Sequence, residues 1–324
     1  MAAAPRRYGR ILAAGGAVPA VILFVIMFGI YIAHEPSALS AFGLGNLVNN
    51  AIVLALAAMG LTIVVLTGEL DLSGSGVIAI ANVVVATTST GSLGSAGSFA
   101  AVLAIGVLVG ALNGWLVAYL GLQSLAVTIG SLIVCQGIAL IILPAPGGEV
   151  AEAIAYGVTG EVFGVPVAAL ILAGAALLWL ILKITRRGIA IYAVGADESA
   201  ARLSGLDVRT TKMFVFVTAG ICYAVAGFVH SAEIGSGDPR VSDSFILFMF
   251  ASVAIGGTSL MGGRGGALGT LVGAGILTVM QKMLFALGVA EFYTNIFTGL
   301  IMIAAIFFGQ LAPLVARVTQ RGTA

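Results

Sequence analysis

A polar segment in the middle of the chain, residues 183–212, most constrains how this sequence folds. It reads KITRRGIAIYAVGADESAARLSGLDVRTTK and holds six of the 14 Lys and Arg residues. So many charges cannot cross a lipid bilayer, and positively charged loops of membrane proteins face the cytoplasm. Long apolar runs lie on both sides of the segment. The chain is therefore expected to fold as a membrane protein around an internal cytoplasmic loop.

The polar segment also carries the signals of a short helix of its own. Asp197 suits the N-cap position, Glu198 the first turn, Arg202 the last turn and Gly205 the C-cap. A short capped helix between two membrane spans requires a role of its own. We therefore expect this helix to dock into another protein.

The composition excludes a soluble globular domain. Hydrophobic residues make up 60% of the chain and charged residues 8%, and the mean hydropathy is +1.17. These values are typical of an all-α, polytopic membrane protein, here a single transmembrane domain over residues 1–324. The chain is rich in glycine, with 45 residues, and small residues allow membrane helices to approach closely.

No catalytic residue, cofactor site or metal site is predicted. The chain has no Walker A motif, no metal-ligand cluster and no catalytic triad pattern, and nothing in it indicates nucleic-acid binding. Cys135 and Cys222 lie inside apolar runs, where a thiol acts as a small hydrophobic group. Any energy that the protein uses must therefore come from elsewhere.

Apolar runs of suitable length predict about ten membrane spans. The third and eighth are short enough to be partial or bent. The expected spans are residues 11–33, 46–67, 76–88, 99–120, 124–143, 167–182, 213–231, 245–255, 267–287 and 294–311.

The charge distribution predicts the orientation of these spans. With ten spans and both termini in the cytoplasm, 12 of the 14 Lys and Arg residues fall on the cytoplasmic side. The opposite side then holds a rim of acidic residues on which a partner could dock. These acids are Glu35, Glu149, Glu152, Glu161, Glu233, Asp238, Asp243 and Glu291.

The sequence TGELDLSGSG at residues 67–76 places Glu69, Asp71 and Ser73 between two apolar runs, with no Lys or Arg nearby in sequence. Charged residues beside lipid usually face a cavity or a partner group, which indicates a broken helix beside a translocation path. An ordinary tight turn, with Asp71 or Ser73 capping the next helix, is an equally good interpretation.

Amide side chains inside spans are further candidates for a translocation path. Each of them could instead make one interhelical hydrogen bond, the commoner role of such a residue. The candidates for the path are Glu69, Asp71, Ser73, Asn49, Asn82 and Asn113.

A glycine-rich break at residues 254–266, AIGGTSLMGGRGG, precedes the ninth expected span. It lacks the Lys-Ser/Thr ending and the preceding soluble strand of a phosphate-binding loop. We expect its glycines to let two helices cross closely on the cytoplasmic side. The candidate helix-crossing glycines are Gly256, Gly257, Gly262 and Gly263.

Three motifs resemble those of a known family and occur in the same order along the chain. The sequence GIAIYAVGADESAARLSGL at residues 188–206 resembles the coupling loop of bacterial ABC-type sugar permeases, the ribose, xylose and autoinducer-2 permease family. GELDLS and GGTSLMGGRG resemble two further hallmarks of that family. The resemblance covers the chain from the first span to the tenth.

The resemblance implies a permease subunit in the bacterial cytoplasmic membrane. Its implied partners are an ABC ATPase subunit, an extracytoplasmic sugar-binding protein and a second permease subunit, in a homodimer or heterodimer. The implied substrate is a sugar, such as a pentose or a related polyol. The residues implied in coupling to the ATPase are Tyr192, Gly195, Asp197, Glu198, Ala200, Ala201, Arg202 and Gly205.

Two alternatives remain open on the sequence. One is a related permease for a branched-chain amino acid or a nucleoside. The other is an ion-coupled secondary transporter, for which Glu69 and Asp71 are the candidate intramembrane acids.

Overall fold

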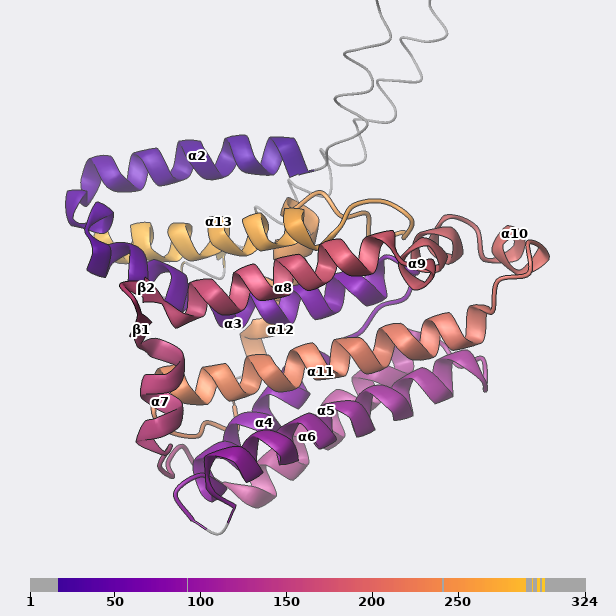
Figure 1. The fold of residues 1–324 in the computed structure, drawn as a ribbon, viewed down its shortest axis with the longest axis horizontal. Coiled ribbons are helices and arrows are strands. Elements are labelled where there is room, and N and C mark those ends of the chain that lie inside the picture. Colours follow the sequence, from indigo (N-terminus) through magenta and orange to yellow (C-terminus); the bar gives the residue numbers. More distant parts are fainter. Residues whose placement is uncertain are drawn as a thin grey trace, which may run out of the picture.

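The protein is a bundle of long helices joined by loops and short elements (Figure 1). The computed structural model describes residues 17–91, 93–240 and 242–289, together with residues 293, 296–297 and 299–300. The long helices within these ranges are α2 (Ala17–His34), α3 (Ala41–Val65), α4 (Ser73–Thr88), α5 (Gly94–Ala118), α6 (Ser124–Ile142), α8 (Val167–Ile184), α11 (Val208–Ile234), α12 (Ser242–Ile255) and α13 (Ala267–Ala286).

Shorter elements lie between the long helices. They are the 3-10 helix η1 (Pro36–Leu39), the helices α7 (Glu152–Thr159), α9 (Arg186–Ala196) and α10 (Glu198–Leu203), and the strands β1 (Glu161–Val162) and β2 (Val165–Pro166). The strands form one antiparallel hairpin, in which Val162 is paired with Val165. Helix α7, the hairpin and a separate α9 were not expected from the sequence.

The second to ninth expected spans, and residues 17–33 of the first, coincide with observed helices, whereas residues 11–16 lie outside the described residues. Within the described residues, six helices are long and apolar enough to cross a membrane: α3, α5, α6, α8, α11 and α13. Shorter apolar helices lie in α2, α4 and α12. The tenth expected span, residues 294–311, lies mainly outside the described residues, as do both termini. The polytopic helical class is therefore confirmed, whereas the count of ten stays a prediction.

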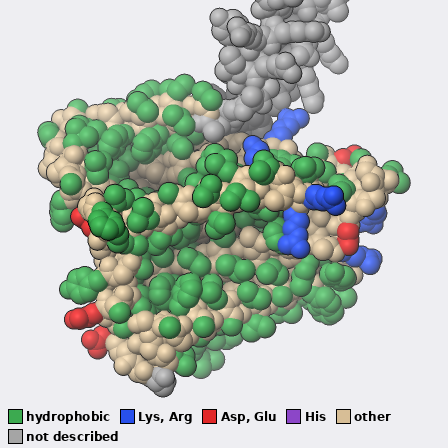
Figure 2. Space-filling view, in the orientation of Figure 1, with side chains coloured by type: hydrophobic (Ala, Val, Ile, Leu, Met, Phe, Trp, Pro, Cys, Tyr) green, Lys and Arg blue, Asp and Glu red, His purple; other side chains and the backbone are tan. Residues whose placement is uncertain are grey.

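The bundle has two chemically different ends (Figures 1 and 2). Helix α7 and the hairpin lie at one end, and α9 and α10 lie at the other. Blue Lys and Arg side chains gather at the α9–α10 end, and hydrophobic side chains cover much of the visible face between the ends. We call the end formed by α9, α10 and the adjoining loops 66–72, 119–123 and 256–266 the basic end.

Helix α11 lies at the centre of the bundle, packed against α5, α3 and α4. Glycines allow the closest of these approaches, because a Cβ added to Gly106 would lie 2.3 Å from the Gly220 carbonyl oxygen. A Cβ on Gly110 would lie 2.4 Å from the Phe216 carbonyl oxygen. This agrees with the expectation that the glycine-rich composition serves close helix packing.

Candidate functional site

The three motifs singled out in the sequence meet at the basic end. The Gly263 amide of the glycine-rich loop donates a 3.0 Å hydrogen bond to the Leu66 carbonyl, just before GELDLS. The Tyr192 hydroxyl of α9 donates a 2.7 Å hydrogen bond to the Gly265 carbonyl. The polar segment, the α3–α4 loop and the α12–α13 loop therefore form one junction.

Glycine backbones make this junction possible. A Cβ on Gly195 would lie 1.8 Å from the Leu66 carbonyl oxygen and 2.7 Å from the Gly263 amide nitrogen. Gly262 has φ +87°, and a Cβ there would lie 2.8 Å from both the Gly195 carbonyl oxygen and the Gly68 amide nitrogen. No other residue type fits these positions without moving the backbone.

The four candidate helix-crossing glycines lie at different contacts. Gly256 does lie where α12 ends against α13, since its added Cβ would be 2.5 Å from the Gly269 carbonyl oxygen. Gly257 turns the chain there, with φ +78°. Gly262 and Gly263, however, contact α9 and the α3–α4 loop rather than a helix crossing.

Helix α10 has the predicted N-cap residue, and its C-cap residue lies one position before the predicted Gly205. The Asp197 carboxylate is the N-cap group and accepts a 2.9 Å hydrogen bond from the Ala200 amide. At the other end, Gly205 follows the C-cap residue Ser204 with φ +82°. The Gly205 amide donates to the Arg202 carbonyl and the Leu206 amide to the Ala201 carbonyl, which is the Schellman arrangement.

The two faces of α10 differ sharply in exposure. Ala201 is 4% exposed and packs with Val194 of α9 and Val208 of α11. It fixes α10 to its own chain, so a direct contact of Ala201 with a partner is excluded in this conformation. Leu203 is 90% exposed on the outer face of the same helix, and Ala200 is also exposed.

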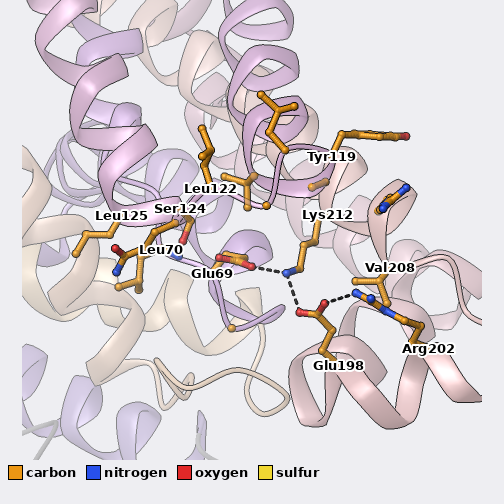
Figure 3. A pocket seen from close by; sticks show the side chains of 17 residues that line it. Glu69, Leu70, Tyr119, Leu122, Ser124, Leu125, Glu198, Arg202, Val208 and Lys212 are labelled. Carbon is orange, nitrogen blue, oxygen red and sulfur yellow. Dashed lines mark hydrogen bonds and ion pairs between the residues drawn. The ribbon is translucent and has the colours of Figure 1, made fainter.

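A chain of ion pairs links α10 to the α3–α4 loop (Figure 3). The Lys212 ammonium of α11 lies 2.6 Å from the Glu69 carboxylate and 2.8 Å from the Glu198 carboxylate. Arg202 lies 2.8 Å from the other oxygen of Glu198. These residues line a pocket of about 620 Å³ whose opposite wall is the α5–α6 loop. Lys212 was not expected from the sequence as the partner of Glu69, because the two residues are distant in the chain.

Two carboxylates of this region are held in the charged form. The hydrogen bond from Lys212 holds the pKa of the Glu198 carboxyl below its usual value of 4.5, and Arg202 acts in the same direction. The pKa of Asp207, the N-cap residue of α11, is lowered by hydrogen bonds from the Thr210 hydroxyl and amide. Desolvation opposes both shifts but is the smaller effect.

Asp71 does not lie in a water-exposed turn. It is 2% exposed, and one of its carboxylate oxygens accepts hydrogen bonds from the Ser73 amide at 2.9 Å and the Ser73 hydroxyl at 2.6 Å. The Asn113 amide of α5 donates to the Ser73 hydroxyl at 2.9 Å and accepts from Ser131 of α6. Asp71 therefore organises the start of α4 and ties it to two neighbouring helices.

The six candidates for a translocation path do not share one cavity in this conformation. Glu69 lies at the basic end, and Asp71, Ser73 and Asn113 belong to the buried network at the start of α4. Asn82 lies on the far side of that helix. Its side-chain amide donates hydrogen bonds to the Ser231 hydroxyl at 2.9 Å and to the Ser236 carbonyl, and it accepts one from the Asp238 amide.

Asn49 donates a 3.3 Å hydrogen bond to the Thr159 carbonyl at the end of α7. These bonds match the commoner role of buried amides, contacts between elements. Within the described part of the chain, no group of three or more His, Cys, Asp and Glu side chains is placed to hold a metal ion.

Comparison with known proteins identifies the chain's relatives. It is 33% identical over 291 residues to the ribose import permease protein of Haemophilus influenzae, an alignment covering 88% of this chain and 90% of that protein. It is 32% identical to the D-allose transport system permease protein of Escherichia coli, covering 80% of each. It is 29% identical to the autoinducer 2 import system permease protein of an Enterobacter species, covering 92% and 88%.

No solved structure matches the chain. A family profile described as "Branched-chain amino acid transport system / permease component" matches residues 43–306. That range includes all three motifs and the junction they form at the basic end. The chain belongs to this permease family.

Proposed function

We propose that this chain is the membrane-spanning permease subunit of an ABC importer that translocates a sugar. The permeases named above import ribose, allose and autoinducer 2. The observation that carries the proposal is α10, a short capped helix with an exposed apolar residue, Leu203, at the basic end of an apolar bundle. Such a helix is suited to seat in a groove of a soluble ATPase.

The proposal includes a topology. Ten spans would place both termini and the basic end in the cytoplasm, in agreement with the charge asymmetry. Hydrophobic side chains exposed on α5, α6 and α8 suit contact with lipid or with a second permease subunit. A homodimer and a heterodimer both fit this surface. The location is the cytoplasmic membrane of a bacterium.

The opposite end suits docking of an extracytoplasmic sugar-binding protein. Glu149, Glu152 and Glu161 are exposed there, on α7 and beside it. A binding protein would meet this rim with basic side chains. Such a protein is expected to supply most of the sugar selectivity.

The junction at the basic end suggests how ATPase motion reaches the membrane helices. Helix α9 contacts the end of α3 through Gly195 and Leu66, and the glycine-rich loop through Tyr192. A push on α10 would therefore displace the α3–α4 and α12–α13 loops together. Rocking of these helices would alternate access to a passage between the subunits.

Two observations weigh against the rival functions. Glu69 is paired with Lys212, so it is not a solitary acid awaiting a coupling ion, and Asp71 is 2% exposed and bound to Ser73, so it does not line an open passage in this conformation. This supports an ATP-driven mechanism over an ion-coupled one. The family description mentions branched-chain amino acids, but the named relatives above import ribose, allose and autoinducer 2.

Reconstitution tests the proposal. The permease, its cognate ATPase and its binding protein are placed in proteoliposomes, and uptake of radiolabelled D-ribose, D-allose and L-leucine is measured with and without ATP. ATP-dependent uptake of a sugar supports the proposal. Uptake of leucine alone would show an amino acid permease, and uptake driven by an ion gradient without ATP would show a secondary transporter.

A further inference from the structure

Lys212 connects three segments that are separate in the sequence. Its ammonium lies between Glu69 of the α3–α4 loop and Glu198 of α10, while its backbone belongs to α11 (Figure 3). The Lys212 and Glu69 side chains are only 12% and 17% exposed. Ion pairs shielded from water to this degree are screened less by salt than surface pairs.

The α11 end of this bridge is firmly placed. The helix begins at Val208, and its N-cap residue Asp207 accepts a 3.0 Å hydrogen bond from the Thr210 amide. Along its length α11 packs against α5, α3 and α4. Lys212 lies in its second turn, so the ammonium is presented from a helix that three neighbouring helices hold in place.

The α3–α4 loop carries the connection on from Glu69 into the bundle. The next backbone amide, that of Leu70, donates a 3.2 Å hydrogen bond to the Ser124 hydroxyl of α6. The Leu72 amide donates a 3.1 Å hydrogen bond to the Thr128 hydroxyl. Asp71 between them holds the start of α4 through Ser73. Displacement of Glu69 is therefore resisted by α4 and α6 together.

We propose that Lys212 is a positioning residue that transmits movement of α10 to the start of α4 through Glu198 and Glu69. This inference rests on the proposed function, in which an ATPase moves α10. The Lys212 bridge is a second route, in addition to the backbone junction at Gly195. That junction acts on the end of α3. The two routes reach different helices, so they are separable by experiment.

Hydrogen exchange in the intact transporter, the permease assembled with its ATPase, tests the inference. Exchange of backbone amides is compared between the nucleotide-free state and the state trapped with ATP and vanadate. In the parent, peptides covering residues 67–75 are expected to change their exchange rate about tenfold between the two states, a typical size for coupling between sites. The Lys212→Met variant keeps the aliphatic stem and should lose this difference.

Three further variants separate transmission from simple damage. Lys212→Arg retains the bridging charge and should retain the difference. Glu198→Gln weakens only the α10 half of the bridge and should also abolish it. Arg209→Met is the matched control, because it removes a positive charge from the same helix end without breaking any ion pair found among the described residues.

Hydrogen exchange of the peptide covering residues 197–205 distinguishes a failure of the proposed function from a failure of the role of Lys212. If α10 docks into the ATPase, this peptide is protected on assembly in the parent and in every variant. Absence of that protection in the parent would overturn the proposed function itself. Two results would overturn the role of Lys212 while α10 is protected. In one, residues 67–75 of Lys212→Met show the same exchange difference between the two nucleotide states as the parent. In the other, residues 67–75 of the parent show no difference between these states.

Discussion

The hydroxyl of Tyr192 donates a hydrogen bond of 2.7 Å to the carbonyl of Gly265. This contact joins α9 to the α12–α13 loop, two segments that are far apart in the chain. Because the Gly265 backbone has φ +108° and lies against Thr258, the acceptor carbonyl is held in a fixed direction. The junction at the basic end therefore depends on a side chain as well as on glycine backbones.

Replacing Tyr192 with Phe should weaken the junction. The change removes the hydrogen bond to Gly265 and leaves the ring in place, so we expect the free energy of unfolding to fall by about 1 kcal/mol. Thermal unfolding of the purified permease measures this. Tyr119→Phe is the control, since Tyr119 is 46% exposed and its hydroxyl makes no hydrogen bond among those found in the described residues. Equal stability of the two variants would contradict the role of the Tyr192 hydroxyl.

Replacing Gly195 with Ala should separate α9 from the α3–α4 loop. Its methyl group would lie 1.8 Å from the Leu66 carbonyl oxygen, and relief of such an overlap by backbone movement costs about 3 kcal/mol. Gly174→Ala in α8 is the control, because nothing lies within 4 Å of its added Cβ. That variant should gain about 0.5 kcal/mol, as Ala favours helix more than Gly does. A parent-like melting temperature for Gly195→Ala would refute the close contact.

Replacing Leu203 with Asp should impair binding of the ATPase without unfolding the permease. The residue is 90% exposed, so its effect on the free energy of unfolding should stay within about 0.5 kcal/mol. Loss of one apolar anchor and its contact area should weaken association about tenfold. The affinity is measured by titrating the ATPase against permease in nanodiscs. Leu203→Met should bind normally, and normal binding by Leu203→Asp would place the docking face elsewhere.

Replacing Asp71 with Asn should destabilise the start of α4. The carboxylate is buried and accepts two hydrogen bonds from Ser73, and charge-assisted bonds of this kind are worth about 1.5 to 3 kcal/mol. Uptake should fall together with the melting temperature. Asp238→Asn is the control, because its carboxylate makes a similar bond to the Arg240 amide at an exposed site. If both variants matched the parent, Asp71 would be an ordinary turn residue.

Acidification should weaken the attachment of α10. The pKa of Glu198 is lowered in the folded protein, chiefly by its hydrogen bond from Lys212. Its contribution to stability is therefore fully present above the ordinary pKa of 4.5 and is lost as the pH falls through the folded-state pKa. The melting temperature is followed from about pH 7 to about pH 3. Glu198→Gln should show a smaller decrease than the parent below pH 4.5, and identical profiles would argue against this ion pair.

The sequence by itself determined the membrane class, nine of the helices and the caps of α10. Each of these depends on residues close together in the chain: runs of apolar side chains set span positions, and Asp197 and Gly205 set the limits of α10. Even the short lengths expected for α4 and α12 agree with the structure.

Only the tertiary structure decided which distant residues meet. Sequence proximity gave no sign that Lys212 pairs with Glu69, or that Gly195 packs on Leu66. Ala201 shows the same limit, because a small residue on a short helix fits either a partner's groove or its own protein's core. The packing of α10 onto α9 and α11 buries it. Such contacts are set by how helices pack, which local propensity does not encode.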